Sequence, residues 1–459
     1  MMKYYYLFLC FILTSNCFAQ VKKDSTISDV DFLIDKIKYK YAGYSDKVKG
    51  NEFERIIKEV KASTSKDTFA NLSKLTMYFN DIHLGLYQIY WPEKIDTNIC
   101  KKNYQVLEAQ SNKKYKEYWI DDLNQTIICL TKNSGNYYEG FVVETKTEAP
   151  IGLSILKFKK DRENNFIADV IDCDDWYRGF MNSTFDNNKL LLIKGYKKWL
   201  KIDYYTKGML NTKTEFVFKP FFKVLDSCNV LLKMPSFSSR YVSFYDSLIQ
   251  ASKSKIISSK NLLIDLRNNR GGIIGNFFSL FPFLGKGSII STGYSSLSSD
   301  DLINDLSIKR EKYFNLKDTE RVSSYDNYLK RLKISRGNFI YNKSDTFSVN
   351  EVDSFPTVKN IAIITNNTCV SAAELMLLYF KQSNKVKVFG QTTGGAVDFL
   401  DEKRFVTPFG KYNFFVPTTK REITPSMPAY DKTGILPDIP ISDDEPDWID
   451  FVKKYYEKK

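Results

Sequence analysis

Short, mostly apolar runs separated by helical patterns dominate the C-terminal half of the chain. The apolar runs are VLLKMPSF (230–237), NLLIDLR (261–267), NIAIITN (360–366) and VKVFG (386–390). Helical patterns lie between them at 242–251 and at AAELMLLYFKQS (372–383). Buried strands that alternate with helices are typical of a layered α/β structure. We therefore expect an α/β core over residues 229–459, with a polar, helical surface insertion at about 295–342.

Two other regions precede this core. Residues 20–98 are expected to form an N-terminal domain that is helical from Ser28 to about Phe79: Phe53, Ile56, Ile57 and Val60 are spaced to form one apolar face. This N-terminal helical domain ends near LGLYQIYW (84–91), a strand-like run that directly follows His83. Residues 99–228 contain short β-type runs between polar turns, which indicates a β-rich domain. The runs include TIICL (126–130), YYEGFVVE (137–144), KLLLIK (189–194) and TEFVFKPFF (214–222).

Length and charge agree with a multi-domain globular protein. The chain has 459 residues, enough for about three domains at roughly 150 residues each. Its 67 Lys and Arg exceed its 54 Asp and Glu, which gives a net charge of +13. The basic residues are interspersed with acidic ones, and no nucleic-acid-binding motif accompanies them. We interpret the charge as a solvated basic surface and expect no nucleic acid partner.

The chain contains a single histidine, His83. This excludes every metal site that needs two histidines. The seven cysteines are too scattered for a zinc ribbon or a disulfide scaffold. We expect no metal site.

The N-terminus has the three parts of a secretory signal peptide. MMK is a short basic start, an apolar stretch follows, and SNCFAQ offers a cleavage site after Ala19. We expect residues 1–19 to be removed and the protein to be secreted, to the periplasm or outside the cell. A lipoprotein anchored at Cys17 is the alternative, although the preceding residues fit a lipobox poorly. No later run is long and apolar enough for a membrane span, so the mature chain is expected to have none.

Three segments contain candidates for chemistry. The first, NLLIDLRNNRGG (261–272), is a strand that runs into Gly271 and Gly272, whose backbone could approach a ligand closely or simply form a turn. The second, NNTCVSAAELMLLYF (366–380), places Ser371 at a helix N-terminus, either as a nucleophile or as the cap of an S-x-x-E capping box. Cys369 is a less favoured nucleophile. The third, LTMYFNDIHLGLY (75–87), contains His83, whose ordinary pKa of about 6.5 suits proton transfer.

Together these motifs resemble the tail-specific, or C-terminal processing, serine peptidase family, particularly its tricorn-core-like and retinoid-binding-protein-like branch. The resemblance rests on DLRNNRGG, on SAAE followed by VFGQTTGGA (388–396), on DIH, and on YDKTGILPDIPI near the end. It covers about residues 230–441 and the region of His83. It implies a ClpP/crotonase-like layered α/β protease core, a peptide or protein substrate, and no cofactor.

The resemblance also implies roles for individual residues. Ser371 matches the nucleophile, and the amides of Ala372 and of Gly271 or Gly272 match the oxyanion hole. The lysine base of the processing proteases is replaced by Ala396, whereas His83 matches the histidine of the tricorn-like branch.

A carboxylate of that branch is also altered. Asp431 stands where the family has a Glu, one methylene longer, and we expect it to help orient the site. Tricorn's serine before the histidine is absent, because Ile82 occupies that position.

These matches predict a secreted serine endopeptidase or carboxy-terminal processing peptidase. The alternative is a catalytically inactive protein on the same fold that binds peptides or lipids, since fold alone does not fix function.

Overall fold

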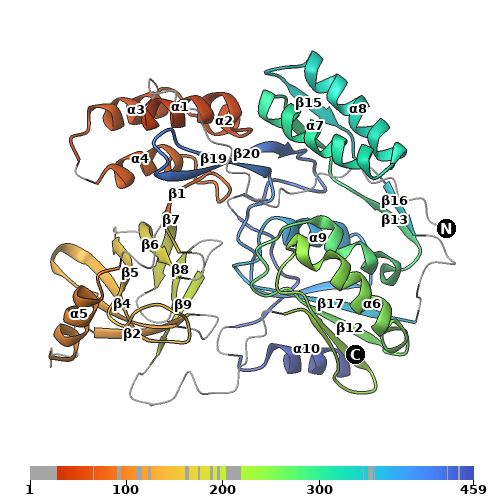
Figure 1. The fold of residues 1–459 in the computed structure, drawn as a ribbon. Helices are drawn as coiled ribbons and strands as arrows, with labels where there is room; N and C mark the ends of the chain where they lie inside the picture. The colour runs from red at the N-terminus through yellow and green to blue at the C-terminus, as the bar shows by residue number, and fades with distance from the viewer. Residues whose placement is uncertain are drawn as a thin grey trace.

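The computed structural model describes residues 28–458 except 66, 90–94, 110–115, 122–125, 161–164, 174–175, 187–189, 194–196, 203–218, 345, 350–354, 356, 432 and 443–444. The expected signal segment, residues 1–19, lies outside the described residues. The fold is a multi-domain α/β structure with N-terminal helices, a large antiparallel sheet and a layered core (Figure 1).

The N-terminal helices pack on one face of the large sheet. They are α1 (Asp29–Lys40), α2 (Tyr44–Lys47), α3 (Glu52–Ala62) and α4 (Thr68–Met77). Helix α3 buries Phe53, Ile57 and Val60, the stripe that its periodicity predicts. Strand β1 (Gly85–Ile89) follows and confirms the strand expected after His83.

The middle of the chain forms a closed ring of antiparallel strands. They are β2 (Lys116–Asp121), β3 (Thr126–Lys132), β4 (Tyr137–Thr145), β5 (Ser154–Lys159), β6 (Asn165–Asp172), β7 (Tyr177–Asp186), β8 (Leu190–Ile193) and β9 (Lys197–Ile202). The ring closes because β2 pairs with β9 and β7 pairs with β8. A short 3-10 turn, Ser134–Asn136, joins β3 to β4. Helix α5 (Thr97–Ala109) precedes the ring and was not expected from the sequence.

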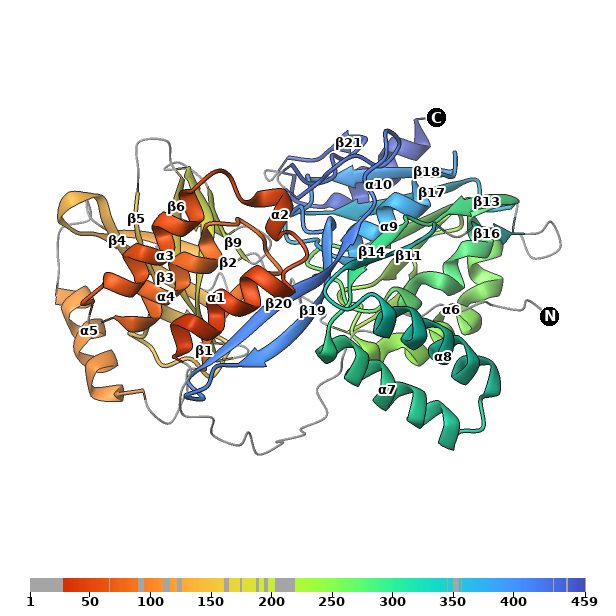
Figure 2. The ribbon, with the colours of Figure 1, turned by 90° about the horizontal axis from the view of Figure 1, so that it is seen from above.

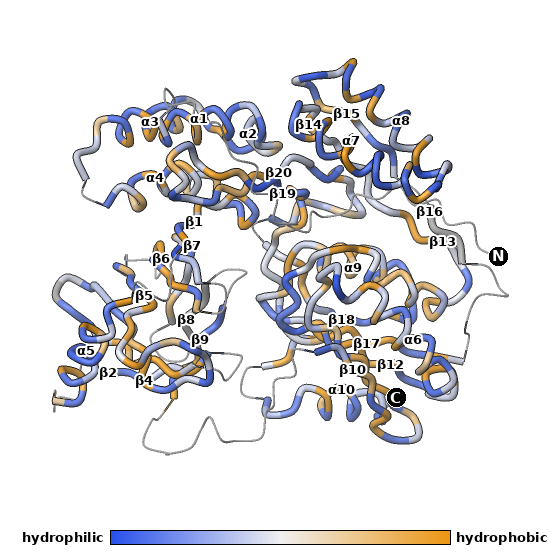
Figure 3. Tube along the Cα trace, viewed as in Figure 1, coloured by the Kyte–Doolittle hydropathy of each residue, from blue (hydrophilic) through white to orange (hydrophobic). Residues whose placement is uncertain are grey.

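A second sheet forms the layered core. Its order is β10 (Phe221–Val224), β11 (Asn229–Lys233), β12 (Asn261–Asp265), β17 (Asn360–Thr365), β18 (Val386–Gly390) and β21 (Ile439–Pro440). The strands from β11 to β21 run parallel, as their apolar runs predict. Apolar residues are concentrated in these strands (Figure 3).

Helices cover both faces of this second sheet (Figure 1). Helices α6 (Val242–Ile257) and α9 (Ala372–Phe380) lie on one face with the 3-10 segment Ile274–Leu284. Helix α10 (Trp448–Glu457) packs on the other face, and a 3-10 turn, Ser239–Tyr241, precedes α6. Within the described residues, no helix combines the length and the apolar character that a membrane span requires.

The polar insertion forms two helices flanked by short strands. They are β13 (Gly287–Ile290), β14 (Tyr294–Leu297), α7 (Asp300–Asn315), α8 (Thr319–Ile334), β15 (Phe339–Asn342) and β16 (Thr346–Val349). The helical character expected for this segment is therefore confirmed.

A long hairpin, β19 (Phe399–Val406) and β20 (Tyr412–Arg421), leaves the core and joins the large sheet. Strand β20 pairs with β1 and with β14, so it connects the N-terminal helices and the ring to the insertion. Figure 2 shows this hairpin between the N-terminal helices and the core. The hairpin brings the segment around His83 to the side of the core that carries Ser371.

Candidate active site

Ser371 lies in the turn between strand β17 and helix α9, with its backbone at φ 60° and ψ −126°. A serine rarely adopts a positive φ, and such strain persists only where the surroundings enforce it. A strained strand-to-helix turn is also the geometry that presents the nucleophile of many serine hydrolases. Only 3% of Ser371 is exposed, so its position is fixed by the packing around it.

The carboxylate of Glu374 fixes the conformation of this turn. It is fully buried and accepts hydrogen bonds from the Ser371 amide (3.1 Å), the Gly395 amide (2.9 Å), the Ala396 amide (2.8 Å) and the Thr393 hydroxyl. Burial raises the pKa of Glu374, and these hydrogen bonds oppose that rise. Glu374 therefore does more than cap a helix: it ties the Ser371 turn to the loop where the processing proteases carry their lysine.

Gly271 approaches Ser371 more closely than any other residue type could, and Gly272 lies likewise close to the backbone of Phe237. Gly271 has φ 84°, and a Cβ on it would lie 2.7 Å from the Cβ of Ser371. Its amide already donates to Asn269 Oδ1 at 2.8 Å. In the described part of the chain, the amides of Gly272 and Ala372 have no such acceptor. These two amides, rather than that of Gly271, are thus available to a developing oxyanion.

His83 and Ser371 line the same cleft, which has a volume of about 680 Å³. Gly271, Gly272 and Glu402 also line it. Aromatic side chains from β1, β7, β20 and the turn before β7 also line it: Tyr87, Trp176, Tyr177, Phe180 and Phe415. The structure therefore brings together, in one apolar-walled cleft, segments that lie far apart in the sequence.

The imidazole of His83 is buried beside several carboxylates. Its backbone amide donates to Asp81 Oδ1 at 3.0 Å. Its Nδ1 is buried and has no hydrogen-bond partner among the described residues. Burial alone would lower the pKa of His83, but the nearby carboxylates, Glu402 foremost, and a hydrogen bond to the Phe399 backbone together hold this pKa above its usual value of 6.5.

Asp431 lies near His83, but its oxygens have other partners. Its Oδ2 is 2.8 Å from the ammonium of Lys47, and its Oδ1 accepts from the Asp398 amide at 3.1 Å. Lys47 also contacts Asp81 at 3.2 Å, and Tyr41 donates to the same Asp81 oxygen at 2.7 Å. Burial raises the pKa of Asp431 to about 6, helped by the charge of Asp81 and opposed by Lys47.

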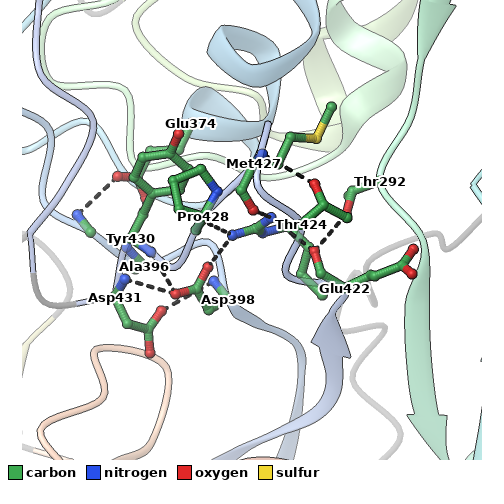
Figure 4. A network of polar contacts seen from close by, with 12 residues as sticks. Thr292, Glu374, Ala396, Asp398, Glu422, Thr424, Met427, Pro428, Tyr430 and Asp431 are labelled. Carbon is green, nitrogen blue, oxygen red and sulfur yellow. Dashed lines mark hydrogen bonds and ion pairs between the residues drawn. The ribbon is translucent and has the colours of Figure 1, made fainter.

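A buried ion pair fixes the loop that carries Asp431. Arg421 contacts Asp398 at 2.5 Å and donates to the carbonyls of Met427 and Pro428. Asp398 Oδ2 accepts from the amides of Tyr430 and Asp431 (Figure 4). Strand β20 therefore holds the 427–431 loop in place.

The sequence analysis did not identify Lys47, Asp398, Arg421 or Glu402 as parts of this site. Each is a charged residue in a polar stretch, where a solvated surface is the ordinary interpretation. When two residues of opposite charge lie far apart in the sequence, nothing in the sequence indicates that their side chains are in contact. Only for Glu374 was a signal present, in the S-x-x-E spacing.

Comparison with known proteins places the core in a family. The model of peptidase family S41 matches residues 230–441. Residues 230–441 are thus similar to peptidase family S41. Ser371, Gly271, Gly272 and Asp431 all lie within this matched segment.

Several solved structures are similar to this chain. A lipoprotein from Streptococcus agalactiae is 22% identical, covers 52% of this chain and 69% of its own, and has a TM-score of 0.33. Mature CPAF complexed with lactacystin is 12% identical, covers 90% and 92%, and has a TM-score of 0.49. A peptidase structure from Parabacteroides merdae is 13% identical, covers 94% and 95%, and has a TM-score of 0.44. No curated protein matches the chain.

The family match begins after the His83 segment. His83, Asp81 and Lys47 all lie outside residues 230–441. The observation that links His83 to Ser371 is therefore the cleft that both residues line.

Proposed function

We propose that the protein is a serine peptidase in which Ser371 is the nucleophile and His83 the general base. The observation that carries this proposal is the shared cleft: a serine in a strained turn and the chain's only imidazole line it together. The amides of Gly272 and Ala372 support the proposal, since their N–H groups can donate hydrogen bonds to a developing oxyanion.

The proposed reaction proceeds in two halves. The Ser371 hydroxyl attacks the scissile carbonyl while His83 takes its proton. The tetrahedral intermediate collapses, the C–N bond breaks, and His83 returns the proton to the leaving amine. Water then attacks the acyl-enzyme with His83 again as the base, which releases the acid and restores Ser371.

The cleft favours a peptide in an extended conformation. Its aromatic wall can bury apolar side chains, while the backbone of the substrate passes between Ser371 and His83. We propose a peptide or protein substrate, cleaved either internally or near its C-terminus. Digestion of a peptide library, followed by mass spectrometry of the products, distinguishes these two modes.

Labelling with a serine-reactive phosphonate tests the proposed nucleophile. We expect the wild-type protein to be labelled at Ser371 and the Ser371→Ala variant to remain unlabelled and unable to hydrolyse peptides. The Cys369→Ala variant is the matched control, because Cys369 is buried two residues away, its Sγ contacts the Leu266 carbonyl, and burial raises its pKa to about 12. Undiminished hydrolysis by Ser371→Ala would overturn the proposal. A folded wild-type protein that is neither labelled nor active would favour the binding-protein alternative.

We also propose that residues 1–19 direct secretion and that the mature protein acts in the periplasm or outside the cell. The basic, apolar and small-residue parts of that segment support this. Intact mass of the protein from a secreting host should correspond to a chain that begins at Gln20. A retained Met1 or a lipidated Cys17 would contradict it.

A further inference from the structure

Glu402 enters the cleft from strand β19, where the strand is locally distorted. Asp401, the preceding residue, has φ 57°, a left-handed conformation that is uncommon inside a strand. The pairing with β20 continues on both sides, with Leu400 opposite Thr419 and Glu402 opposite Pro417. Such distortions redirect a side chain. Here the Glu402 side chain lines the same cleft as His83 and Ser371.

Among the carboxylates around His83, Glu402 is the one without another partner. Asp81 accepts hydrogen bonds from Tyr41, Lys47 and the His83 backbone. Asp431 contacts Lys47 and accepts from the Asp398 amide. In the part of the chain that the structure describes, no cation or hydrogen-bond donor other than the imidazole is placed to neutralise Glu402.

One nitrogen of the His83 imidazole also lacks a hydrogen-bond partner among the described residues. It is the buried Nδ1, whereas a buried polar atom in a native structure normally has such a partner. A catalytic histidine requires a carboxylate for two purposes: to orient the ring and to stabilise the imidazolium that forms when it takes a proton. Two carboxylates line the cleft, those of Asp81 and Glu402. Both oxygens of Asp81 already accept hydrogen bonds from other groups, which leaves the carboxylate of Glu402.

We propose that Glu402 is the carboxylate that stabilises the His83 imidazolium, and that Asp431 instead anchors Lys47 and the 427–431 loop. This assignment rests on the proposed function, because it gives His83 the role of the base. It makes Glu402 a positioning residue that acts through His83.

The charges of His83 and Glu402 support one another. Burial raises the pKa of Glu402, and the positive imidazole opposes that rise. Glu402 is in turn the leading cause that raises the pKa of His83. In a poorly solvated cleft, an imidazolium and a carboxylate attract each other strongly.

Other ionisable groups also face the site from neighbouring elements. Asp81 precedes β1, Asp401 lies on β19, and Asp431 lies in the loop before β21; all three favour the charged imidazole. Tyr87 of β1 is buried with a raised pKa and stays neutral. The cleft wall also contains two guanidinium groups, Arg270 and Arg404, which favour the neutral imidazole.

The protein's only imidazole allows a direct test by NMR titration of a sample without a histidine tag. We compare the wild-type protein with Glu402→Gln and Asp431→Asn, each of which removes one charge and keeps the side-chain size. Glu402→Gln should lower the His83 pKa more than Asp431→Asn does. The pH at which kcat/KM is half-maximal should move down with it, and kcat should fall roughly 10²-fold. Glu402→Asp should restore part of both losses.

Three results would overturn the assignment: an unchanged His83 pKa in a folded Glu402→Gln variant, an equal change in both variants, or a larger change in Asp431→Asn. If Glu402→Gln does not fold, Glu402→Asp must still lower kcat without raising KM. The imidazole titration does not depend on activity. Failure of the phosphonate to label the protein would therefore contradict the proposed peptidase function. The NMR comparison would still show which carboxylate faces His83.

Discussion

Ser371 has a backbone conformation that an L-amino acid rarely adopts. Substitution at this position measures how much this conformation lowers the free energy of unfolding. Ser371→Gly removes the side chain that makes φ 60° unfavourable, whereas Ser371→Ala keeps a Cβ there. We expect the glycine variant to have a free energy of unfolding about 1 kcal/mol above that of the alanine variant. Denaturant unfolding of both variants checks this, and an alanine variant of equal or greater stability would show that the turn is not strained.

The single histidine also gives opposite pH dependences to activity and stability. The base must be neutral, so kcat/KM should rise as the pH increases through the His83 pKa, with an inflection above the usual 6.5. Because this pKa is raised in the folded state, the proton on His83 stabilises the fold below the unfolded pKa, and that contribution is lost as the pH rises through the folded value.

Denaturant unfolding of wild type and of His83→Gln at about pH 6 and about pH 8 checks the second effect. The difference in unfolding free energy should favour the wild type more at the lower pH. An equal difference at both values would contradict the raised pKa. Activity of His83→Gln near the wild-type level would sink His83 as the base.

At the scale of elements, Lys47 attaches the short helix α2 to two segments of the site. Its ammonium is 12% exposed and contacts Asp81 and Asp431, whose side chains are 1% and 10% exposed. Lys47→Met would leave both carboxylates without their cation, at a cost of about 3 kcal/mol of unfolding free energy near neutral pH. The loss should shrink as the carboxylates become protonated at lower pH.

An exposed pair provides the matched control for that measurement. Lys61 contacts Asp31 at 2.7 Å, but the two side chains are 52% and 54% exposed. Lys61→Met should change the unfolding free energy by less than about 1 kcal/mol. A similar loss in both variants would show that burial of the Lys47 contacts does not stabilise the fold.

The elements also show which parts of the structure a sequence reveals. The parallel strands β12, β17 and β18 are buried on both faces, so their continuous apolar runs predicted them. Helix α5 buries only Cys100 and Leu107, too few residues for a helical stripe. Strand β19 has the sequence FLDEKRFV, and its Glu402 faces the cleft instead of an apolar core. Its apolar and polar residues therefore do not alternate as they would in a half-buried strand, and the sequence did not predict it. The motif residues of the site were predicted, but the charged residues that join distant segments were not.

At the scale of the whole molecule, strand β20 holds the parts together. It pairs with β1, β14 and β19, and its Phe414 is fully buried among residues of the N-terminal helices. Phe414→Ala should cost about 3–5 kcal/mol of unfolding free energy and lower kcat/KM, because β1 directly follows His83. Phe409→Ala, at the 57% exposed tip of the hairpin, should change neither quantity appreciably. Equal effects in the two variants would exclude this role of β20.

The connection made by β20 also governs when activity can arise during synthesis. A ribosome completes the His83 segment early, but the strand that pairs with β1 is residues 412–421. A nascent chain that already contains Ser371 still lacks the strand that brings His83 to it. The cleft that both residues line can therefore assemble only after residues 412–421 have been made.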